Sequence, residues 1–280
     1  MHPDAYRGVV ISPGRALGVA ALAAVALACG VPSAAARDAP EVGYDVSHPQ
    51  CGDALPGDPA FAVVGVNGGL ATRPNPCLAE QLAWAAAEAT GEVPAQPEVQ
   101  LYVNTANPGQ VRDLVTTWPT GGLTPYGRCD GDNSRACSWQ YGWERAAVTV
   151  TDFFVPAAED AGIDPDPARY RWWLDVETTN TWQTGSAPAR ARNRAALEGM
   201  TTRLTVIGGE VGLYSTGYQW RRIAGPVPED SPLHELDSWL AGATSLAGAR
   251  ENCERDPLVD GGRVVLTQYV EDGLDHDHSC

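Results

Sequence analysis

The sequence predicts an α/β fold in which about five βα units and a final run of strands form a closed or nearly closed barrel. Two observations support this. Short β-rich runs alternate with helical stretches through most of the chain, which is typical of a parallel sheet covered by helices. Near the C-terminus, strand-like runs follow one another with no long helix between them. Residues 37–280 are enough for a single domain with its own core.

The expected elements are short and are defined by their composition and by the turns that separate them. The βα strands are residues 42–46, 61–66, 99–103, 170–176 and 211–215. The helices between them are residues 78–89, 139–161 and 189–207. Two later strands lie near residues 238–241 and 263–269, and we expect a third, less well defined, between residues 244 and 256.

The N-terminus has the pattern of a secretory signal peptide. Arg7 and Arg15 precede an apolar run at residues 16–29, and three alanines at residues 34–36 form a small-residue cleavage site. The run is shorter than the roughly 20 residues that a membrane-spanning helix needs. A lipid anchor on Cys29 is the alternative. We expect residues 1–36 to be removed and the protein to be secreted, with no membrane attachment after cleavage.

Six cysteines remain after residue 36, and an even number in an exported chain predicts disulfides. The pairs we expect are Cys129 with Cys137 around a short Gly/Asp/Asn loop, Cys253 with Cys280 at the C-terminus, and Cys51 with Cys77. No CxxC pair occurs, and His276 and His278 have no matching ligand pair, so we expect neither a metal nor another cofactor.

The composition is strongly acidic. The chain has 19 basic residues and 35 acidic ones, for a net charge of −16. A surface of this charge repels nucleic acid and anionic lipid, so the sequence argues against both as partners. We expect a monomer.

The segment YRWWLDVETTNTW contains the strongest candidate catalytic residues. Asp175 and Glu177 are two residues apart, so they point to the same side at the end of a strand. In barrels the carboxyl ends of the strands form the active-site face, and Asp45 ends the first strand at the same face. Neighbouring carboxylates raise each other's proton affinity, which suits one of them to act as a general acid. Alternatively, these acids are solvated, and Asp45 caps a turn.

Further candidates could bind a substrate at that face. Tyr214 and Trp182 offer aromatic surfaces for stacking on sugar rings. Gln268 lies on the last clear strand, and Asp275 or Asp277 could add a fourth acid, although an acidic tail is often simply solvated.

Together these motifs resemble, in order, the glycoside hydrolase family 25 muramidases, lysozymes that cut peptidoglycan. The matching segments are GYDVSHPQC, FAVVGVNGG, LYVNTANPG, WWLDVETT, VGLYSTGYQW, SWLAGA and LTQY. The resemblance implies an irregular TIM-like (β/α) barrel of five βα units and three strands. It also implies that Glu177 protonates the glycosidic oxygen while Asp175 assists attack by the substrate's own acetamido group, with Asp45 as a further functional acid.

The sequence departs from the family at several groove positions. GVNGG replaces the usual lysine and glutamate after the second strand, YVN with Asn104 replaces an aromatic-histidine-aromatic run, the sixth strand lacks a tyrosine, and TQY with Gln268 replaces WQY. The chain is similar in this respect to exported actinobacterial glycoside-hydrolase-like domains of unknown function. The sequence therefore predicts a hydrolase of peptidoglycan or a related N-acetylated polysaccharide, or a non-catalytic carbohydrate- or wall-binding domain on the same barrel.

Overall fold

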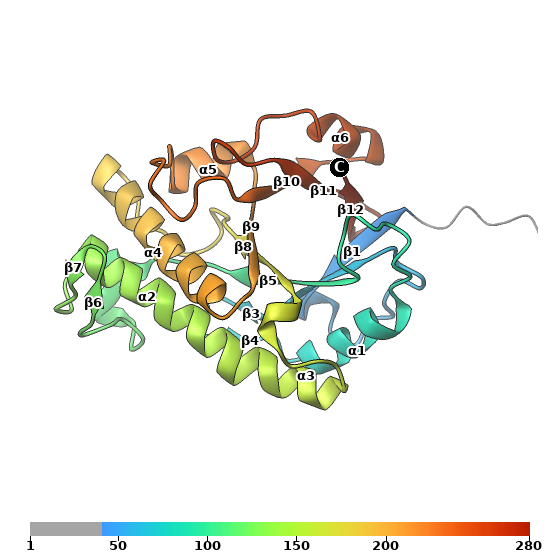
Figure 1. Ribbon diagram of the computed structural model, residues 1–280, viewed down its shortest axis with the longest axis horizontal. Helices are drawn as coiled ribbons and strands as arrows, with labels where there is room; N and C mark the ends of the chain where they lie inside the picture. The colour runs from blue at the N-terminus through green and yellow to red at the C-terminus, as the bar shows by residue number, and fades with distance from the viewer. Residues whose placement is uncertain (1–40) are drawn as a thin grey trace, which may run out of the picture. The chain divides into compact units, whose positions relative to one another are not determined.

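Eight strands close into a barrel in the computed structural model, which describes residues 41–280 (Figure 1). The order around the barrel is β1-β12-β11-β10-β9-β8-β5-β2. Neighbouring strands are parallel except at β12, which is antiparallel to both β1 and β11. The strands are β1 (Val42–Val46), β2 (Ala62–Gly65), β5 (Val99–Asn104), β8 (Arg171–Asp175), β9 (Glu210–Ser215), β10 (Asp237–Ala243), β11 (Val264–Glu271) and β12 (Leu274–Ser279). This arrangement confirms the expected α/β barrel. The expected signal peptide and Cys29 lie outside the described residues.

Five of the connections between strands contain α-helices. These are α1 (Leu78–Glu88), α2 (Arg135–Val148) and α3 (Val155–Ala161), α4 (Ala187–Val206), α5 (Gly217–Ile223) and α6 (Leu246–Asn252). A π-helical turn, Thr149–Phe154, joins α2 to α3, and three short 3₁₀ segments lie at His48–Gln50, Pro108–Leu114 and Pro167–Arg169. Two small hairpins pair β3 (Asn67–Gly68) with β4 (Arg73–Pro74) and β6 (Leu123–Thr124) with β7 (Gly127–Arg128).

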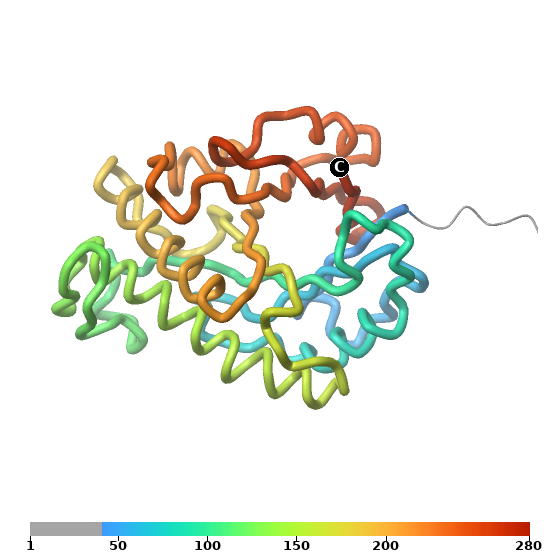
Figure 2. The backbone as a smooth tube through the Cα atoms, viewed as in Figure 1, coloured from blue at the N-terminus to red at the C-terminus, as the bar shows by residue number. Residues whose placement is uncertain are grey.

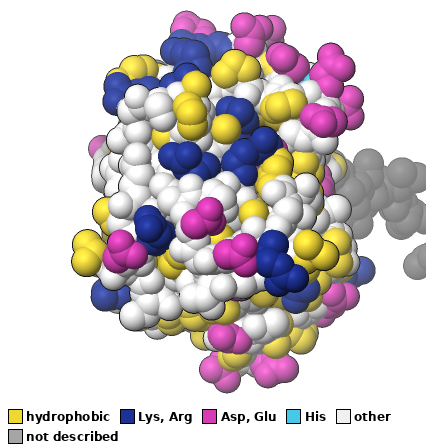
Figure 3. All heavy atoms as spheres, turned by 90° about the vertical axis from the view of Figure 1, so that its left-hand side faces the viewer, with side chains coloured by type: hydrophobic (Ala, Val, Ile, Leu, Met, Phe, Trp, Pro, Cys, Tyr) yellow, Lys and Arg dark blue, Asp and Glu magenta, His cyan; other side chains and the backbone are white. Residues whose placement is uncertain are grey.

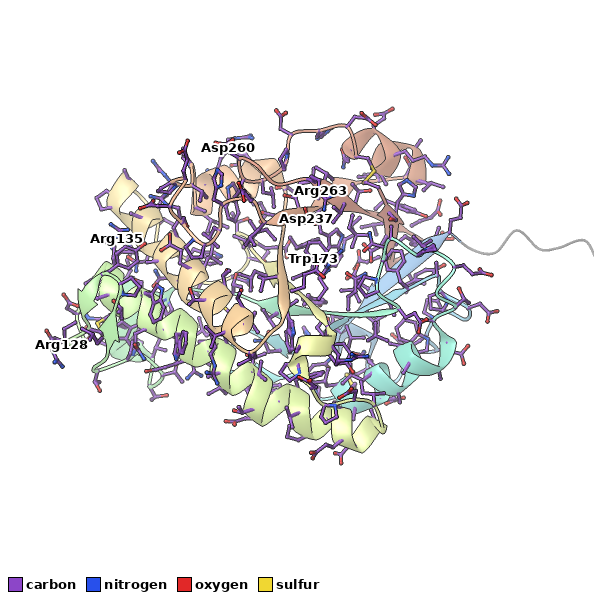
Figure 4. All side chains as sticks on the ribbon, viewed as in Figure 1. Arg128, Arg135, Trp173, Asp237, Asp260 and Arg263 are labelled. Carbon is purple, nitrogen blue, oxygen red and sulfur yellow. A yellow bond between two sulfur atoms is a disulfide. The ribbon has the colours of Figure 1, made fainter. Side chains whose placement is uncertain are left out.

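The barrel has two apolar layers. The larger one fills the space between the strands and the helices, and Trp172, Leu197 and Met200 belong to it. A smaller layer, which includes Phe61 and Trp173, fills the barrel interior, where Trp173 lies near the centre of the molecule (Figure 4). The barrel interior is therefore a packed core and not an open pore.

Helices α2 and α4 run side by side and approach each other closely (Figure 2). A Cβ atom on Gly142 would collide with the carbonyl oxygen of Ala196, and one on Gly199 would collide with that of Trp139. Both contacts are with backbone atoms, which cannot move aside. These two glycines therefore set the distance between the helices.

The prediction of a strand between residues 244 and 256 was wrong, because that segment forms α6. The eighth strand is instead β12, with the sequence LDHDHS. Its polar side chains hide the usual hydrophobic alternation, and its backbone pairing with β1 and β11 defines it as a strand. Asp275 and Asp277 alternate with His276 along it, and His276 packs between Tyr44 and Tyr269.

All three predicted disulfides are present. They join Cys51 to Cys77, Cys129 to Cys137 and Cys253 to Cys280, with Cα–Cα distances of 5.7, 4.6 and 5.5 Å. Within residues 41–280, no helix has both the length and the apolar character needed to cross a bilayer.

Candidate active site

An open cavity of about 400 Å³ lies at the carboxyl ends of the parallel strands. Most of its lining side chains come from the barrel strands, and a few come from the loop after β1. They are Asp45, Ser47, His48, Pro49, Gln50, Tyr102, Asn104, Asp175, Glu177, Tyr214, Trp239, Gln268 and Asp275. The cavity therefore brings together acidic, amide and aromatic side chains.

The strand register explains this convergence. Asn104, Asp175, Tyr214 and Trp239 are successive partners across β5, β8, β9 and β10, so they form one continuous level of the barrel wall. On the opposite side, Asp45 of β1 is paired with Asp275 of β12. Directly opposed residues on neighbouring strands have side chains on the same face of the sheet. Acids more than 100 residues apart in sequence thus meet because of the register.

Asp45 is held by hydrogen-bonded side chains from other strands. Its Oδ2 atom accepts a hydrogen bond of 2.8 Å from Nε2 of Gln268, whose Oε1 accepts one of 2.7 Å from the hydroxyl of Tyr214. Burial, followed by the negative charge of Asp275, raises the pKa of Asp45 to about 8. The surroundings of Asp45 therefore favour its neutral, protonated form.

Asp175 and Glu177 share a side of the strand end but differ in their surroundings. Asp175 is only 5% exposed, and burial, followed by the charges of Glu177 and Asp45, raises its pKa well above the ordinary value. Its Oδ1 atom is buried and has no hydrogen-bond partner within the described part of the chain. Glu177 is half-buried, and its Oε1 atom lies 3.4 Å from Nε2 of Gln219. Of the two, Glu177 is the more accessible.

The two acids of β12 lie at different depths. Asp275 lines the cavity, and burial together with the charge of Glu177 raises its pKa. Asp277 is fully buried below it, and neither of its carboxyl oxygens has a hydrogen-bond partner among residues 41–280. Burial, followed by the charges of Asp45 and Asp275, raises the pKa of Asp277 well above the ordinary value. Asp275 is therefore the fourth acid of the cavity, and Asp277 is a buried acid beneath it.

Most of the predicted site residues lie in the cavity, but Trp182 does not. Its side chain is only 9% exposed and belongs to the apolar layer between strands and helices. Its Nε1 atom donates a hydrogen bond of 2.9 Å to the backbone oxygen of Glu177. Trp182 thus supports the segment that carries Glu177, and the part of it that remains exposed lines a second hollow.

Two aromatic residues of the cavity were missed by the sequence analysis. Tyr102 and Trp239 both line it, and Trp239 packs on Tyr214 with 4.4 Å between ring centroids. Tyr102 could have been found, because it lies two residues before Asn104 on the same strand. Trp239 could not have been found in this way, because its segment, SWLAGA, contains no predicted site residue.

This arrangement suits binding and acid catalysis on a carbohydrate. Aromatic faces and hydrogen-bonding side chains are the usual complement of a sugar ring and its hydroxyls. Four carboxyl groups meet in one cavity and differ in exposure: Asp45 and Asp175 are buried, whereas Glu177 and Asp275 are half-buried. When carboxyl groups lie in different environments, one can donate a proton while another accepts one.

No family model and no curated protein matches the sequence. Among solved structures, the chain is similar to a muramidase from Trichobolus zukalii, with 16% identity and a TM-score of 0.46 over 85% of this chain and 93% of that chain.

Proposed function

We propose that this protein is an exported glycoside hydrolase that cleaves peptidoglycan or a related N-acetylated polysaccharide. The observation that carries the proposal is the convergence of Asp45, Asp175, Glu177 and Asp275 in one open cavity with aromatic walls. The resemblance of the YDVS and DVE segments to the family 25 muramidases supports the same reaction.

Glu177 is the proposed general acid. A general acid must reach the glycosidic oxygen, and Glu177 combines exposure to the cavity with a position two residues beyond the carboxyl end of β8. Two contacts hold the residue: Gln219 faces its carboxyl group, and Trp182 binds its backbone oxygen. Its carboxyl would protonate the leaving oxygen as the bond to the anomeric carbon breaks.

Asp175 is the proposed partner of the substrate's acetamido group. In a substrate-assisted reaction, the acetamido oxygen attacks the anomeric carbon, and a neighbouring carboxyl binds the amide N–H. Asp175 lines the cavity, and its Oδ1 lacks a hydrogen-bond partner among the described residues, so the carboxyl has spare capacity to accept that N–H. Asp45 and Asp275, which face each other across β1 and β12, would bind the sugar beside it.

The location of the protein is part of the proposal. Three disulfides fit an oxidising compartment outside the cytosol. We therefore propose secretion, with a polysaccharide as the partner and the monomer as the working form.

The test is release of new reducing ends from purified peptidoglycan by the mature protein. Reduction of the products with borohydride and analysis of the sugars would identify the new end. We expect reduced muramic acid, as cleavage by a muramidase requires. New ends on glucosamine would contradict the muramidase assignment, and the absence of new ends on every N-acetylated glycan would contradict the proposed activity.

A non-catalytic carbohydrate-binding domain is the second candidate, and one observation favours it. At the position where the muramidases carry charged residues after the second strand, Asn67 uses its side chain within the protein. Its Oδ1 accepts from the backbone of Asn104 at 2.7 Å, and its Nδ2 donates to Thr149 at 3.1 Å. Saturable binding of wall fragments without new reducing ends would support this candidate.

A further inference from the structure

A second hollow, of about 380 Å³, lies beside the cavity and is lined by three arginines, Arg190, Arg221 and Arg222. Among the described residues, no aspartate or glutamate lines it. Arg190 belongs to α4, and the other two belong to α5. The face of the molecule that includes these helices shows basic side chains gathered above its middle (Figure 3). We call this region the arginine hollow.

The three guanidinium groups are available to a ligand. In the part of the chain that the structure describes, none of them forms a salt bridge with a carboxylate. Arg222 donates a hydrogen bond to the hydroxyl of Tyr218 at 3.0 Å, and Arg221 is exposed. In a chain with 35 acidic residues and 19 basic ones, a hollow lined by three arginines without a carboxylate is a marked local reversal of charge.

The positive end of a long helix adds to this charge. Gly185 lines the hollow, and α4 begins two residues later and continues for 20 residues. The N-terminus of a helix carries a partial positive charge that favours a nearby anion. The hollow thus combines three guanidinium groups with a favourable helix dipole.

The arginine hollow adjoins the candidate active site through one short segment. Glu177 lines the cavity, and Thr178 and Asn180 line the hollow. Helix α5 connects the two sites, because it carries Arg221 and Arg222 together with Gln219, whose Oε1 atom accepts a hydrogen bond of 2.9 Å from the hydroxyl of Thr178. A polymer bound in the cavity could therefore place a substituent in the hollow.

We infer that the arginine hollow binds an oxyanion, a carboxylate or a phosphate, that is attached to the glycan held in the cavity. The inference rests on the proposed function for the identity of the polymer. Guanidinium groups bind carboxylates and phosphates through paired hydrogen bonds. Such a site gives a strongly acidic protein a local attraction for an anionic wall polymer, which its overall charge would repel.

The experiment compares two charge-matched double variants of the mature protein. Arg221→Gln with Arg222→Gln alters the hollow, whereas Arg128→Gln with Arg255→Gln removes two exposed arginines elsewhere; Arg128 lies on β7 (Figure 4). Binding is measured by sedimentation with three glycans. These are peptidoglycan with peptide stems, the same strands after an amidase has removed the stems, and stem-free strands that carry a phosphodiester polymer. Reducing ends are counted in the same samples.

We expect the hollow variant to lose roughly tenfold more affinity for one of the two anionic glycans than for the bare strands, as the loss of charge-assisted hydrogen bonds predicts. A selective loss with stem-bearing strands identifies a carboxylate, and one with the phosphodiester polymer identifies a phosphate. An equal loss on all three glycans, or the same loss in the control variant, would overturn the inference.

The assay also separates this inference from the proposed function. If the inference is overturned but the wild-type protein cleaves bare strands, the proposed hydrolase function still holds. If the selective loss of affinity occurs but no glycan is cleaved, the inference that the hollow binds an oxyanion holds and the hydrolase assignment fails. A lack of binding to every glycan overturns both.

Discussion

Gln268 and Asp45 are 223 residues apart in the sequence, and their side chains meet in a hydrogen bond of 2.8 Å. Gln268 also accepts a hydrogen bond from Tyr214. Side chains from three strands, β1, β9 and β11, are therefore linked in one hydrogen-bonded series. This series holds an acid of the cavity in place and provides it with a donor. It also gives the barrel a contact between the first and last parts of the described chain.

Replacing Gln268 by leucine should destabilise the protein. The change removes the donor to Asp45 and the acceptor of Tyr214, and it leaves buried polar groups without partners. We expect a loss of about 1–3 kcal/mol in the free energy of unfolding, measured by urea titration at pH 7. Tyr214→Phe removes only the outer hydrogen bond and should cost less. Equal stability of the Gln268→Leu variant and wild type would contradict a role for this series.

The buried acids should make stability depend on pH. Burial raises the pKa of Asp45 from 3.8 to about 8 and that of Asp277 well above 3.8. A carboxyl whose pKa is higher in the folded state binds its proton more tightly there. Its contribution is therefore complete below about pH 4 and is lost as the pH rises toward the pKa of the folded state.

Asp277→Asn should reduce this dependence, because an amide of similar shape does not ionise. We expect the Tm of the variant to fall less than that of wild type between pH 5 and pH 8. Asp256→Asn, an exposed substitution, serves as the control and should follow wild type. Parallel curves for all three proteins would show that Asp277 is not responsible.

Two disulfides differ most in the size of the loop that each bond closes. The Cys253–Cys280 bond spans 27 residues and the Cys129–Cys137 bond spans 8. Chain-entropy arguments give losses of about 3.5 and about 2.5 kcal/mol when the paired cysteines are replaced by serine. Only the first change should also lower activity, because Cys280 directly follows β12, which carries Asp275. Chemical denaturation and hydrolysis assays check both expectations; the opposite order of stability would contradict the loop-size argument.

Asp175→Asn tests the proposed substrate-assisted reaction. The amide keeps the size of the side chain but has no acidic proton to lose, so it cannot become the charged group that would stabilise the developing intermediate. We expect kcat to fall by about 10²–10³-fold, as for the loss of one well-placed electrostatic group, with a smaller change in KM. A variant with unchanged kcat would remove Asp175 from the reaction.

Much of the barrel could be predicted because its strands follow ordinary rules. Residues 42–46 were predicted as a strand and form β1, since a short apolar run between turn residues suits a buried parallel strand. The disulfide pairs could be predicted because short loops and the chain end left few sensible partners. The pairing of Asp45 with Asp275 could not, because it depends on the register of β1 and β12, and the sequence of β12 hides the strand itself.

The candidate site, like the fold, could be predicted in part. Asp175 and Glu177 could be placed together from their spacing on one strand. Trp182 lies outside the cavity and lines the arginine hollow instead, a placement that depends on residues distant in sequence and could not be predicted from its own segment. The arginine hollow joins residues of different segments, and nothing in the sequence indicated it.

The central claim is that Glu177 donates the proton in glycoside hydrolysis, and the most direct measurement is kcat for reducing-end release from peptidoglycan by wild type and Glu177→Gln. Glu229→Gln is the matched control, because Glu229 is exposed and lies outside the cavity. We predict that Glu177→Gln lowers kcat by about 10²–10⁴-fold, while its binding of the glycan persists and the control keeps wild-type activity. Equal kcat values for wild type and Glu177→Gln would contradict the assignment.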